Sequence, residues 1–369
     1  MSTLLIFIDG LSCDLAKERL TFLRGGKVLP ITPGIGFSNN LYPEMLCGQT
    51  PDEIGYFNEW SPATAERSPL PFYLQMADVA RNFLYLNAGF RKIFLQKVMG
   101  INFANIPFKY AHYFEPEGSH NFRDLKSGLL QDYKFDIFDA VEMRAPVGFR
   151  DAMAIDRAEF DMRNANTLVS LVDLDNIAHI HGIHSTRFSN HIALLDVKIN
   201  SLVDSFLKVD PDASVFVFSD HGMADVEKAV LLDVETVAGE MAYGKYLYFL
   251  DSTFLRVWVK DAMIASAITE YLGGFEHGDV LSQQERVDFG ITNSEFGDII
   301  FRAKEGVLFL PNFYGARHVK AMHGYDSQLA SQTAFIAKIK GNDHAKIQPR
   351  RSKDVFAYLT ENLAAKVSE

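Results

Sequence analysis

The sequence predicts an α/β fold built on a mostly parallel central sheet. Short apolar segments, typical of strands that are buried on both faces, occur at 4–8, 167–175 and 215–218. An aspartate ends each segment or follows it within two residues, and a glycine lies further along: Gly10, Gly182 and Gly222. Residues 189–207 carry apolar side chains at helical spacing between the second and third segments. This strand–helix–strand order favours parallel pairing of the two strands.

Composition and charge place the chain among soluble globular proteins. Its 369 residues suit one large domain or a core with an insertion, with 48% apolar and 22% charged residues. The net charge of -11 argues against a general nucleic-acid binder, because contacts to a phosphate backbone require positive charge. Two cysteines, Cys13 and Cys47, provide no disulfide framework.

The N-terminal segment predicts a first strand. Residues 1–10 lack a basic start and a small-residue cleavage site, so they do not resemble a signal peptide. No stretch reaches about 18 uncharged apolar residues, the length that a membrane span requires. We therefore expect a cytoplasmic location and no transmembrane segment.

Asp9 and Ser38 are the first candidate site residues in the chain. Asp9 follows the first strand, where it could also be a solvated turn residue. A glycine- and proline-rich loop at 30–36 leads to Ser38, and a helical pattern then runs to Gly48. A serine at such a junction is most often an N-cap. The same position suits a nucleophile, because a helix N-terminus stabilises an alkoxide and a bound phosphoryl group.

Residues 56–162 differ in character from the rest of the chain. They show no clear strand–helix alternation and are rich in aromatic residues at helical spacing. We therefore predict a largely helical cap at 56–162, inserted into an α/β core formed by 1–55 and 163–369.

Basic residues interleave with aromatic residues inside this predicted cap, and no acid lies among them. They are Arg81, Arg91, Lys92, Lys97 and Lys109. Packing of the cap on the core explains the apolar positions of this stretch. The alternative is an amphipathic surface that meets a lipid or lipid-linked substrate, with peripheral membrane contact.

An acid and histidines follow the second buried strand. Asp175 lies four residues before His179, and three histidines fall within six residues: His179, His181 and His184. We expect a strand-end loop here that can wrap a metal ion from two sides. Asp220 and His221 form a second such pair at a glycine turn, where both side chains can converge on a cation. Carboxylate and imidazole together suit zinc, with manganese as the alternative.

The remaining elements continue the alternation of strands and helices. A polar cluster around His323 precedes the last strand. The expected elements are a strand pair at 246–260, a helix at 262–272, two short strands at 297–313, a strand at 333–339 and a C-terminal helix at 353–363.

Five places in the chain offer oxygen or imidazole ligands at strand ends or glycine turns. Jointly they supply three aspartates, three histidines and a hydroxyl, enough for two metal ions with a nucleophile between them. The residues are Asp9, Ser38, Asp175, His179, Asp220, His221 and His323.

At this point the sequence resembles the alkaline phosphatase superfamily, and most closely its nucleotide pyrophosphatase/phosphodiesterase branch. The matching motifs occur in order along the chain: Ile8-Asp9-Gly10, Gly48-x-x-Pro51-x-x-x-Gly55, Asp175-x-x-x-His179-x-His181-Gly182, Ser219-Asp220-His221-Gly222-Met223 and His323-Gly324-Tyr325-Asp326. The resemblance implies a three-layer α/β/α core. It also implies that Asp9, Asp220 and His221 hold one metal ion and that Asp175, His179 and His323 hold the other.

Two departures from that branch concern the nucleophile segment. Ser38 stands where the branch has a threonine, and the asparagine on the oxyanion side falls at Leu41. Asn39 or Asn40 would have to substitute for that asparagine. Both departures bear more on the substrate than on the mechanism.

The expected function is that of a two-metal phosphodiesterase or nucleotide pyrophosphatase acting through a phospho-Ser38 intermediate. The substrate would be a small phosphate ester, namely a nucleotide, a nucleotide-sugar or a lipid-linked phosphate. The alternative is a phosphomutase or phosphomonoesterase of the same superfamily; a mutase would need an arginine-rich cap. The setting of Cys47 does not match that of a sulfatase, and intact ligand positions argue against a binding protein without activity.

Overall fold

The structure is a computed structural model, and it describes most of the chain in two compact units. The described residues are 2–24, 26–36, 38–63, 72, 75, 76, 79, 106–117, 125, 127–161, 165–315 and 317–365. Unit 1 comprises Met1–Ile54, His120–Glu227 and Val319–Glu369, and unit 2 comprises Gly55–Ser119 and Lys228–His318.

A six-stranded sheet forms the centre of unit 1. In spatial order its strands are β2 (Lys27–Ile31), β16 (Ala334–Lys340), β7 (Ser214–Phe218), β1 (Thr3–Ile8), β6 (Thr167–Leu171) and β5 (Asp136–Asp139). The four strands from β7 to β5 are parallel, whereas β16 is antiparallel to both of its neighbours. The prediction of an α/β fold with a mostly parallel central sheet is confirmed.

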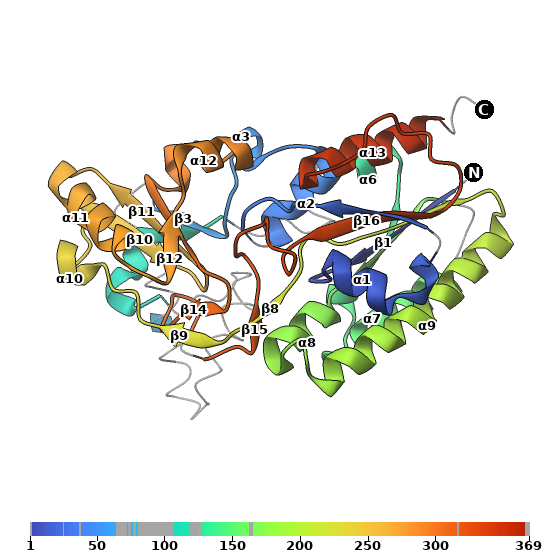
Figure 1. The fold of residues 1–369 in the computed structure, drawn as a ribbon, viewed down its shortest axis with the longest axis horizontal. Helices are drawn as coiled ribbons and strands as arrows, with labels where there is room; N and C mark the ends of the chain where they lie inside the picture. The colour runs from blue at the N-terminus through green and yellow to red at the C-terminus, as the bar shows by residue number, and fades with distance from the viewer. Residues whose placement is uncertain are drawn as a thin grey trace. The chain divides into compact units, whose positions relative to one another are not determined.

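Helices cover both faces of this sheet, which gives three layers. Figure 1 shows α2, α6 and α13 on one face and α1, α7, α8 and α9 on the other. Their bounds are α1 (Cys13–Arg19), α2 (Ser38–Cys47), α6 (Leu129–Asp132), α7 (Arg150–Phe160), α8 (Asp173–His181), α9 (Thr186–Val209) and α13 (Ser352–Ala365). Shorter elements of the unit are α3 (Pro51–Ile54), η1 (Thr21–Leu23), η3 (Ala140–Glu142) and the antiparallel pair β8 (Ala224–Asp225) and β15 (Ala321–Met322).

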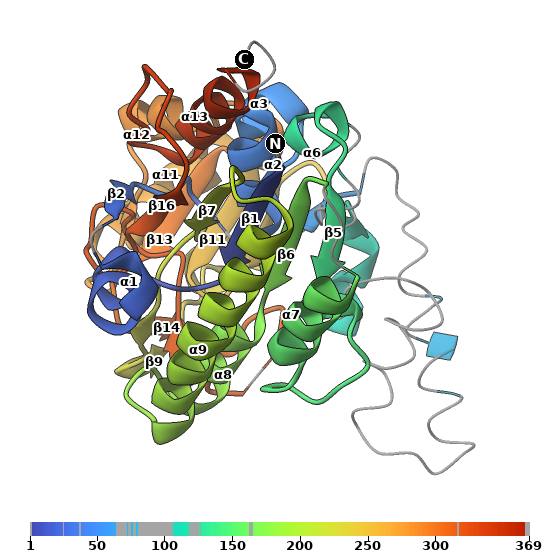
Figure 2. The same cartoon turned by 90° about the vertical axis from the view of Figure 1, so that its right-hand side faces the viewer.

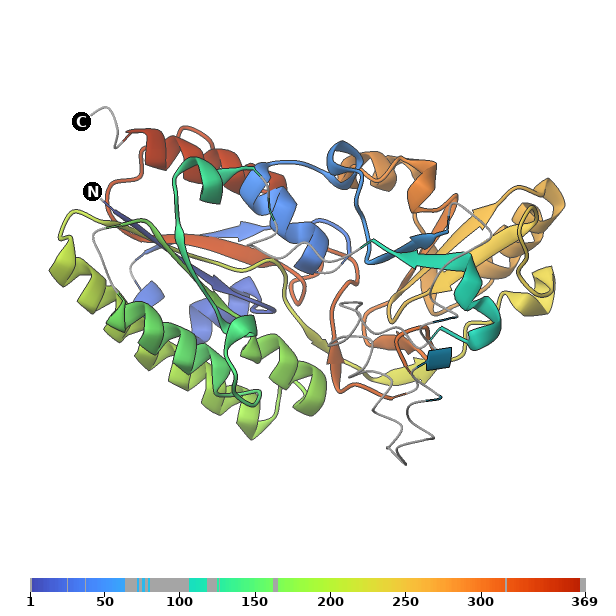
Figure 3. The same cartoon turned by 180° about the vertical axis from the view of Figure 1, so that it is seen from behind.

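The central strand β1 shows why both faces need a helical layer. Leu4, Ile6 and Ile8 belong to the core under α7, α8 and α9, and Leu5 and Phe7 belong to the core under α2 and α13. Successive side chains of a strand point to opposite faces, so an uninterrupted apolar strand must be covered on both sides. Figure 2 shows α7, α8 and α9 side by side on one face, and Figure 3 shows α2 and α13 on the other.

Unit 2 is organised around a four-stranded antiparallel sheet. Its strands, in spatial order, are β10 (Tyr246–Leu250), β11 (Phe254–Val259), β13 (Ile299–Ala303) and β12 (Gly278–Val280). Two further pairs are β3 (Trp60–Pro62) with β4 (Phe114–Pro116), and β9 (Lys228–Val230) with β14 (Val307–Phe309). The helices with defined bounds among its described residues are α10 (Glu235–Ala238), α11 (Ala262–Gly273), α12 (Gln283–Phe289), η2 (Phe108–Tyr113) and η4 (Ser294–Phe296).

The division into units differs from the predicted core and cap. The predicted boundary at 162 is corrected, because β5 pairs in parallel with β6 and α7 packs beside α9 in unit 1. Residues 228–318, expected in the core, belong to unit 2. The four-residue strand β5 is too short to show a pattern of its own, which explains why the sequence did not reveal it.

The described part of 56–162 is also less helical than expected, since it contains β3, β4 and β5. Of the basic residues noted there, Arg81, Arg91, Lys92 and Lys97 lie outside the described residues. Lys109 is described, and its Nζ lies 2.7 Å from Glu240 Oε1. Every helix in the described part of the chain is too short or too polar to span a bilayer.

Candidate active site

The carboxyl ends of three neighbouring parallel strands carry the site, all within unit 1. Asp9 directly follows β1, and its backbone N–H donates to the carbonyl of Leu171 at the end of β6. Asp220 and His221 follow β7, which pairs with β1 on its other side. Open α/β sheets place ligands at such strand ends, where side chains from separate loops converge. Asp9, Asp220 and His221 are all buried.

Asp175 and His179 lie on helix α8, not in the loop that the sequence predicted. The helix begins two residues after β6, and four-residue spacing places both side chains on one helical face. His179 Nε2 is 3.3 Å from Asp175 Oδ1. The two candidate ligands are therefore presented side by side by a helix that ends at His181. Gly182 caps it with a φ of 87°, which suits glycine.

Ser38 is the first residue of α2, and its hydroxyl reaches the strand ends. Ser38 Oγ lies 3.1 Å from His221 Nε2 and 3.3 Å from Asp9 Oδ1. Tyr42, one turn later on the same helix, donates its hydroxyl to Asp9 Oδ2 over 3.4 Å. No sequence motif singles out Tyr42, although its spacing of four residues from Ser38 places it on the same helical face.

Backbone carbonyls orient two of the imidazole rings. His221 Nδ1 lies 2.9 Å from the carbonyl oxygen of Gly222, and His179 Nδ1 lies 2.8 Å from that of Ala321. A carbonyl only accepts hydrogen bonds, so each Nδ1 carries the hydrogen, and Nε2 of the neutral ring keeps its lone pair. Both Nε2 atoms face carboxylates. Donation of the other ring N–H to a carbonyl is the arrangement that metal-binding histidines adopt.

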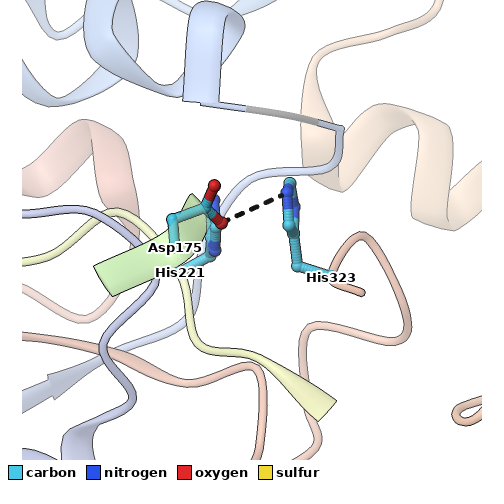
Figure 4. A group of neighbouring side chains, drawn as sticks. All are labelled: Asp175, His221 and His323. Carbon is cyan, nitrogen blue, oxygen red and sulfur yellow. Dashed lines mark ion pairs between the residues drawn. The ribbon is translucent and has the colours of Figure 1, made fainter. Parts of the chain in front are cut away.

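His323 closes the site from the other side. It follows β15, which pairs with β8, the short strand just beyond His221. The rings of His323 and His221 are stacked with their centroids 3.8 Å apart. His323 Nε2 lies 3.9 Å from Asp175 Oδ1, the ion pair drawn in Figure 4.

The ligand atoms form two overlapping groups. Asp9, Asp220 and His221 each offer one ligand atom within 4.8 Å of the others, and so do Asp175, His221 and His323. The first group is the set that the resemblance implied for one metal ion. In the second, His221 stands where His179 was expected, while His179 lies beside Asp175. His221 belongs to both groups. The assignment of ligands to individual ions thus stays a prediction.

The buried charges of this site fit divalent cations. Burial, followed by repulsion from Asp220 and Asp175, raises the pKa of Asp9 well above its ordinary value. The pKa of Asp220 is also raised, mainly by burial. For Asp175, burial acts to raise the pKa, but the nearby His179 and His323 outweigh it and lower the pKa.

Two oxygen atoms of the site are open to a further partner. Asp175 Oδ1 and Asp220 Oδ2 are buried and accept no hydrogen bond from the described residues. Buried carboxylate oxygens without such a bond are costly, and a cation would compensate them. The oxygen and imidazole donors are of the kinds that zinc and manganese bind.

Three other candidate residues do not join these groups, namely Asn40, His181 and His184. Asn40 is buried and donates from Nδ2 to the carbonyl oxygen of Ile35, so it supports the loop before α2. The side chain of Asn39 lies outside what the structure describes. His181 Nε2 accepts a hydrogen bond from Arg187, and His184 is largely exposed, 3.9 Å from Asp225.

Comparisons with known proteins agree with the motifs and the fold. Residues 30–326 match the family described as type I phosphodiesterase / nucleotide pyrophosphatase. Human ectonucleotide pyrophosphatase/phosphodiesterase 5 is 15% identical and superposes with a TM-score of 0.62, over 99% of this chain and 95% of that one. An inactive form of the murine protein in complex with AMP gives 16% and 0.60, with the same coverage.

A phosphonoacetate hydrolase from Sinorhizobium meliloti, in complex with phosphonoacetate, is similar to the same degree. It is 14% identical with a TM-score of 0.61, over 98% of this chain and 95% of that one. None of the curated proteins matches this sequence. Because the family match covers most of the chain, the protein belongs to the type I phosphodiesterase / nucleotide pyrophosphatase family of the alkaline phosphatase superfamily.

Proposed function

We propose that the protein is a metal-dependent hydrolase of phosphodiester or pyrophosphate bonds that works through Ser38. One observation carries the proposal: the Ser38 hydroxyl lies within 3.3 Å of both Asp9 and His221, at the edge of a buried cluster of carboxylates and imidazoles. Family membership supports the class of reaction. Asp9, Asp175, His179, Asp220, His221 and His323 would hold two divalent ions, zinc or manganese.

The residues of the chain would act on the nucleophile and on its surroundings. Bound cations would lower the pKa of the Ser38 hydroxyl and offset the charge of the phosphate. Asp9 Oδ1 accepts a hydrogen bond from Ser38 and orients its hydroxyl. Attack of Oγ on phosphorus forms an oxygen–phosphorus bond as the bond to the leaving oxygen breaks, which gives phospho-Ser38. Water then cleaves phospho-Ser38 and restores the hydroxyl.

We propose a small phosphate ester of the nucleotide or nucleotide-sugar type as substrate. The AMP complex of the murine structural neighbour supports a nucleotide, and the phosphonoacetate hydrolase makes a phosphonate worth testing. A lipid-linked phosphate is kept as a third class. The cytoplasmic location expected from the sequence stays a prediction.

A substrate screen tests the proposal. Wild-type protein, Ser38→Ala and the control Ser201→Ala, which changes an exposed serine on α9, are assayed with zinc or manganese. The substrates are bis-p-nitrophenyl phosphate, p-nitrophenyl phosphate, a UDP-sugar and phosphonoacetate. We expect hydrolysis of the diester and the UDP-sugar by wild type and Ser201→Ala, and almost none by Ser38→Ala.

The pattern of activities separates the alternatives. Preference for p-nitrophenyl phosphate over the diester would favour a phosphomonoesterase. Hydrolysis of phosphonoacetate alone would show that the enzyme cleaves a carbon–phosphorus bond and not a phosphoester bond. Equal activity of Ser38→Ala and wild type would remove Ser38 from the mechanism.

A further inference from the structure

A cavity lies in unit 1, on the face of α8 that points away from Asp175 and His179. It has a volume of about 590 Å³, within the size range of small-molecule sites, and its walls come from α8, α9 and the loop before α7. Ile177, Ile180 and His181 line it from α8. At 100° per residue these three positions fall opposite Asp175 and His179, so one helix separates the cavity from the candidate active site.

The lining of this cavity combines apolar side chains with donors and contains no acid. Phe149, Ile180 and Leu194 supply apolar surface, and Phe149 and Ile180 are 64% and 54% exposed at the rim. Arg187 and Asn190 supply hydrogen-bond donors from the first turns of α9. The only formally charged side chain in the lining is the guanidinium of Arg187, so the cavity is positively charged although the chain has a net charge of -11.

Neighbouring histidines hold the polar side of the cavity in place. Arg187 Nη1 donates to His181 Nε2 over 3.0 Å, which orients the guanidinium and leaves its other N–H groups for a ligand. His191 forms part of the floor; it is 4% exposed, and its Nε2 lies 2.8 Å from Asp151 Oδ2. Arg187 and His191 are thus held in place before a ligand arrives, which lowers the entropy cost of binding.

Asp151, Asp173 and His191 lie close enough together to suggest a metal site, but their partners argue against one. Asp151 Oδ1 accepts the backbone N–H groups of Val172 and Asp173. Asp173 Oδ1 is 2.6 Å from both Nε and Nη2 of Arg150, so a guanidinium already occupies the place of a cation. Asp151 instead holds His191 in the floor of the cavity.

We propose that the cavity is a second binding site, for an amphipathic anion. A carboxylate, sulfonate or phosphate head would be bound by Arg187, which pairs with such groups through a planar fork of donors. Asn190 would add a donor, and Phe149, Ile180 and Leu194 would contact an apolar body. A substrate of the candidate active site would lie on the other face of α8, so the two sites are distinct.

Fluorescence titration of the zinc-loaded full chain tests this proposal, with anilinonaphthalene sulfonate as the amphipathic anion. N-phenylnaphthylamine, which has the same aromatic body without the sulfonate, is the uncharged probe. Arg187→Gln removes the guanidinium, and Lys208→Gln removes one positive charge from the far end of α9 as its control. Leu194→Trp fills the cavity, and Val197→Trp adds the same side chain to an exposed position of α9.

We expect Arg187→Gln to weaken binding of the sulfonate by about tenfold or more, the scale of a charge-assisted hydrogen bond, and to leave the uncharged probe unaffected. Leu194→Trp should weaken both probes. The two control variants and Ser38→Ala should bind like wild type, so failure of the proposed catalytic role would not alter this result.

Equal affinities of Arg187→Gln and Lys208→Gln for the sulfonate would overturn the proposal. So would equal affinities of the two tryptophan variants, because the probe would then lie elsewhere. Arg187 is exposed, so its substitution keeps the test valid even if Leu194→Trp fails to fold, which circular dichroism would show.

Discussion

Ser38 Oγ and His221 Nε2 lie 3.1 Å apart, although 183 residues separate them in the chain. The first residue of α2 therefore touches the turn that follows β7. A nucleophile at this place needs only a hydroxyl on a short side chain, because α2 and the strand ends already fix its position.

Ser38→Thr and Ser38→Val test the hydroxyl at constant shape. Threonine and valine have nearly the same volume, but only threonine keeps an oxygen beside Asp9 and His221. We expect Ser38→Thr to retain activity within about tenfold and Ser38→Val to lose on the order of 10³-fold or more in kcat. Steady-state hydrolysis of bis-p-nitrophenyl phosphate measures this. Similar activity of both variants would argue against nucleophilic attack by residue 38.

His179→Gln should weaken binding of zinc, whereas His184→Gln should not. His179 Nε2 faces Asp175, but His184 is 86% exposed at its side chain and lies at the other end of the same histidine-rich segment. Loss of a residue that hydrogen-bonds to a metal ligand lowers the metal affinity about 10–100-fold. Loss of the ligand itself should lower the affinity for zinc at least as much. Competition with a chelator gives the affinity. Equal affinities of the two variants would exclude His179 as a ligand.

Tyr42→Phe should lower activity moderately without unfolding the protein. The change removes a hydrogen bond to Asp9 Oδ2 but keeps the ring, which packs edge-on against Phe7. A net loss of about 1 kcal/mol corresponds to roughly fivefold in kcat/KM. Tyr243→Phe, which removes a hydroxyl in unit 2 that donates to the carbonyl oxygen of His112, is the control. Unchanged activity of Tyr42→Phe would mean that Asp9 does not need the hydrogen bond from Tyr42.

Metal removal should destabilise the protein, and this effect should shrink in acid. Burial raises the pKa of Asp9 and Asp220, so their negative charges oppose folding until a cation compensates them. As the pH falls these carboxyls protonate at a higher pH than ordinary aspartates do, and protons then compete with the metal. At a free metal concentration about 100 times Kd, stabilisation would reach about 2.7 kcal/mol.

Thermal unfolding with and without a chelator, at several pH values, measures this difference in stability. Asp220→Asn should reduce the difference at neutral pH, because it removes one of the carboxylates. A gap between the two melting temperatures that is constant from pH 4 to 7 would show that these carboxyls do not bind the metal.

Glu44→Gln should stabilise the protein at alkaline pH. Burial raises the pKa of Glu44 from 4.5 to about 8, against the opposing effect of Lys353 and Arg351. Folding therefore favours the protonated carboxyl, and this contribution is complete below about pH 4.5 and lost as pH rises toward 8. Glutamine keeps the shape without the charge, so the gain should be on the order of a few kcal/mol near pH 9 and small at pH 5.

Melting temperatures of wild type and Glu44→Gln at these two pH values check the prediction. Glu44 Oε1 accepts no hydrogen bond from the described residues, and a Cβ on Gly34 would lie 2.5 Å from the carboxylate. The carboxyl is thus held against the loop that leads to Ser38. Equal stability of the two proteins at both pH values would mean that water reaches Glu44 in solution.

The strands and their polar ends could be predicted from the sequence because they depend on local pattern. Continuous apolar segments buried on both faces indicated β1, β6 and β7. Asp9 directly follows β1, and Asp220 follows β7 after one residue. Parallel strands bring such ends to one edge of the sheet, so the convergence of these carboxylates follows from the fold class.

Only the tertiary structure decided how the side chains meet. His221 belongs to both ligand groups, His323 stacks on it, and the hydroxyl of Tyr42 reaches Asp9. These contacts depend on ångström-scale packing between segments far apart in the chain. The boundaries of the two units depend likewise on pairing between remote strands, as with β14 and β9. Local pattern carries no information on such distances, because they are set by which elements pack together.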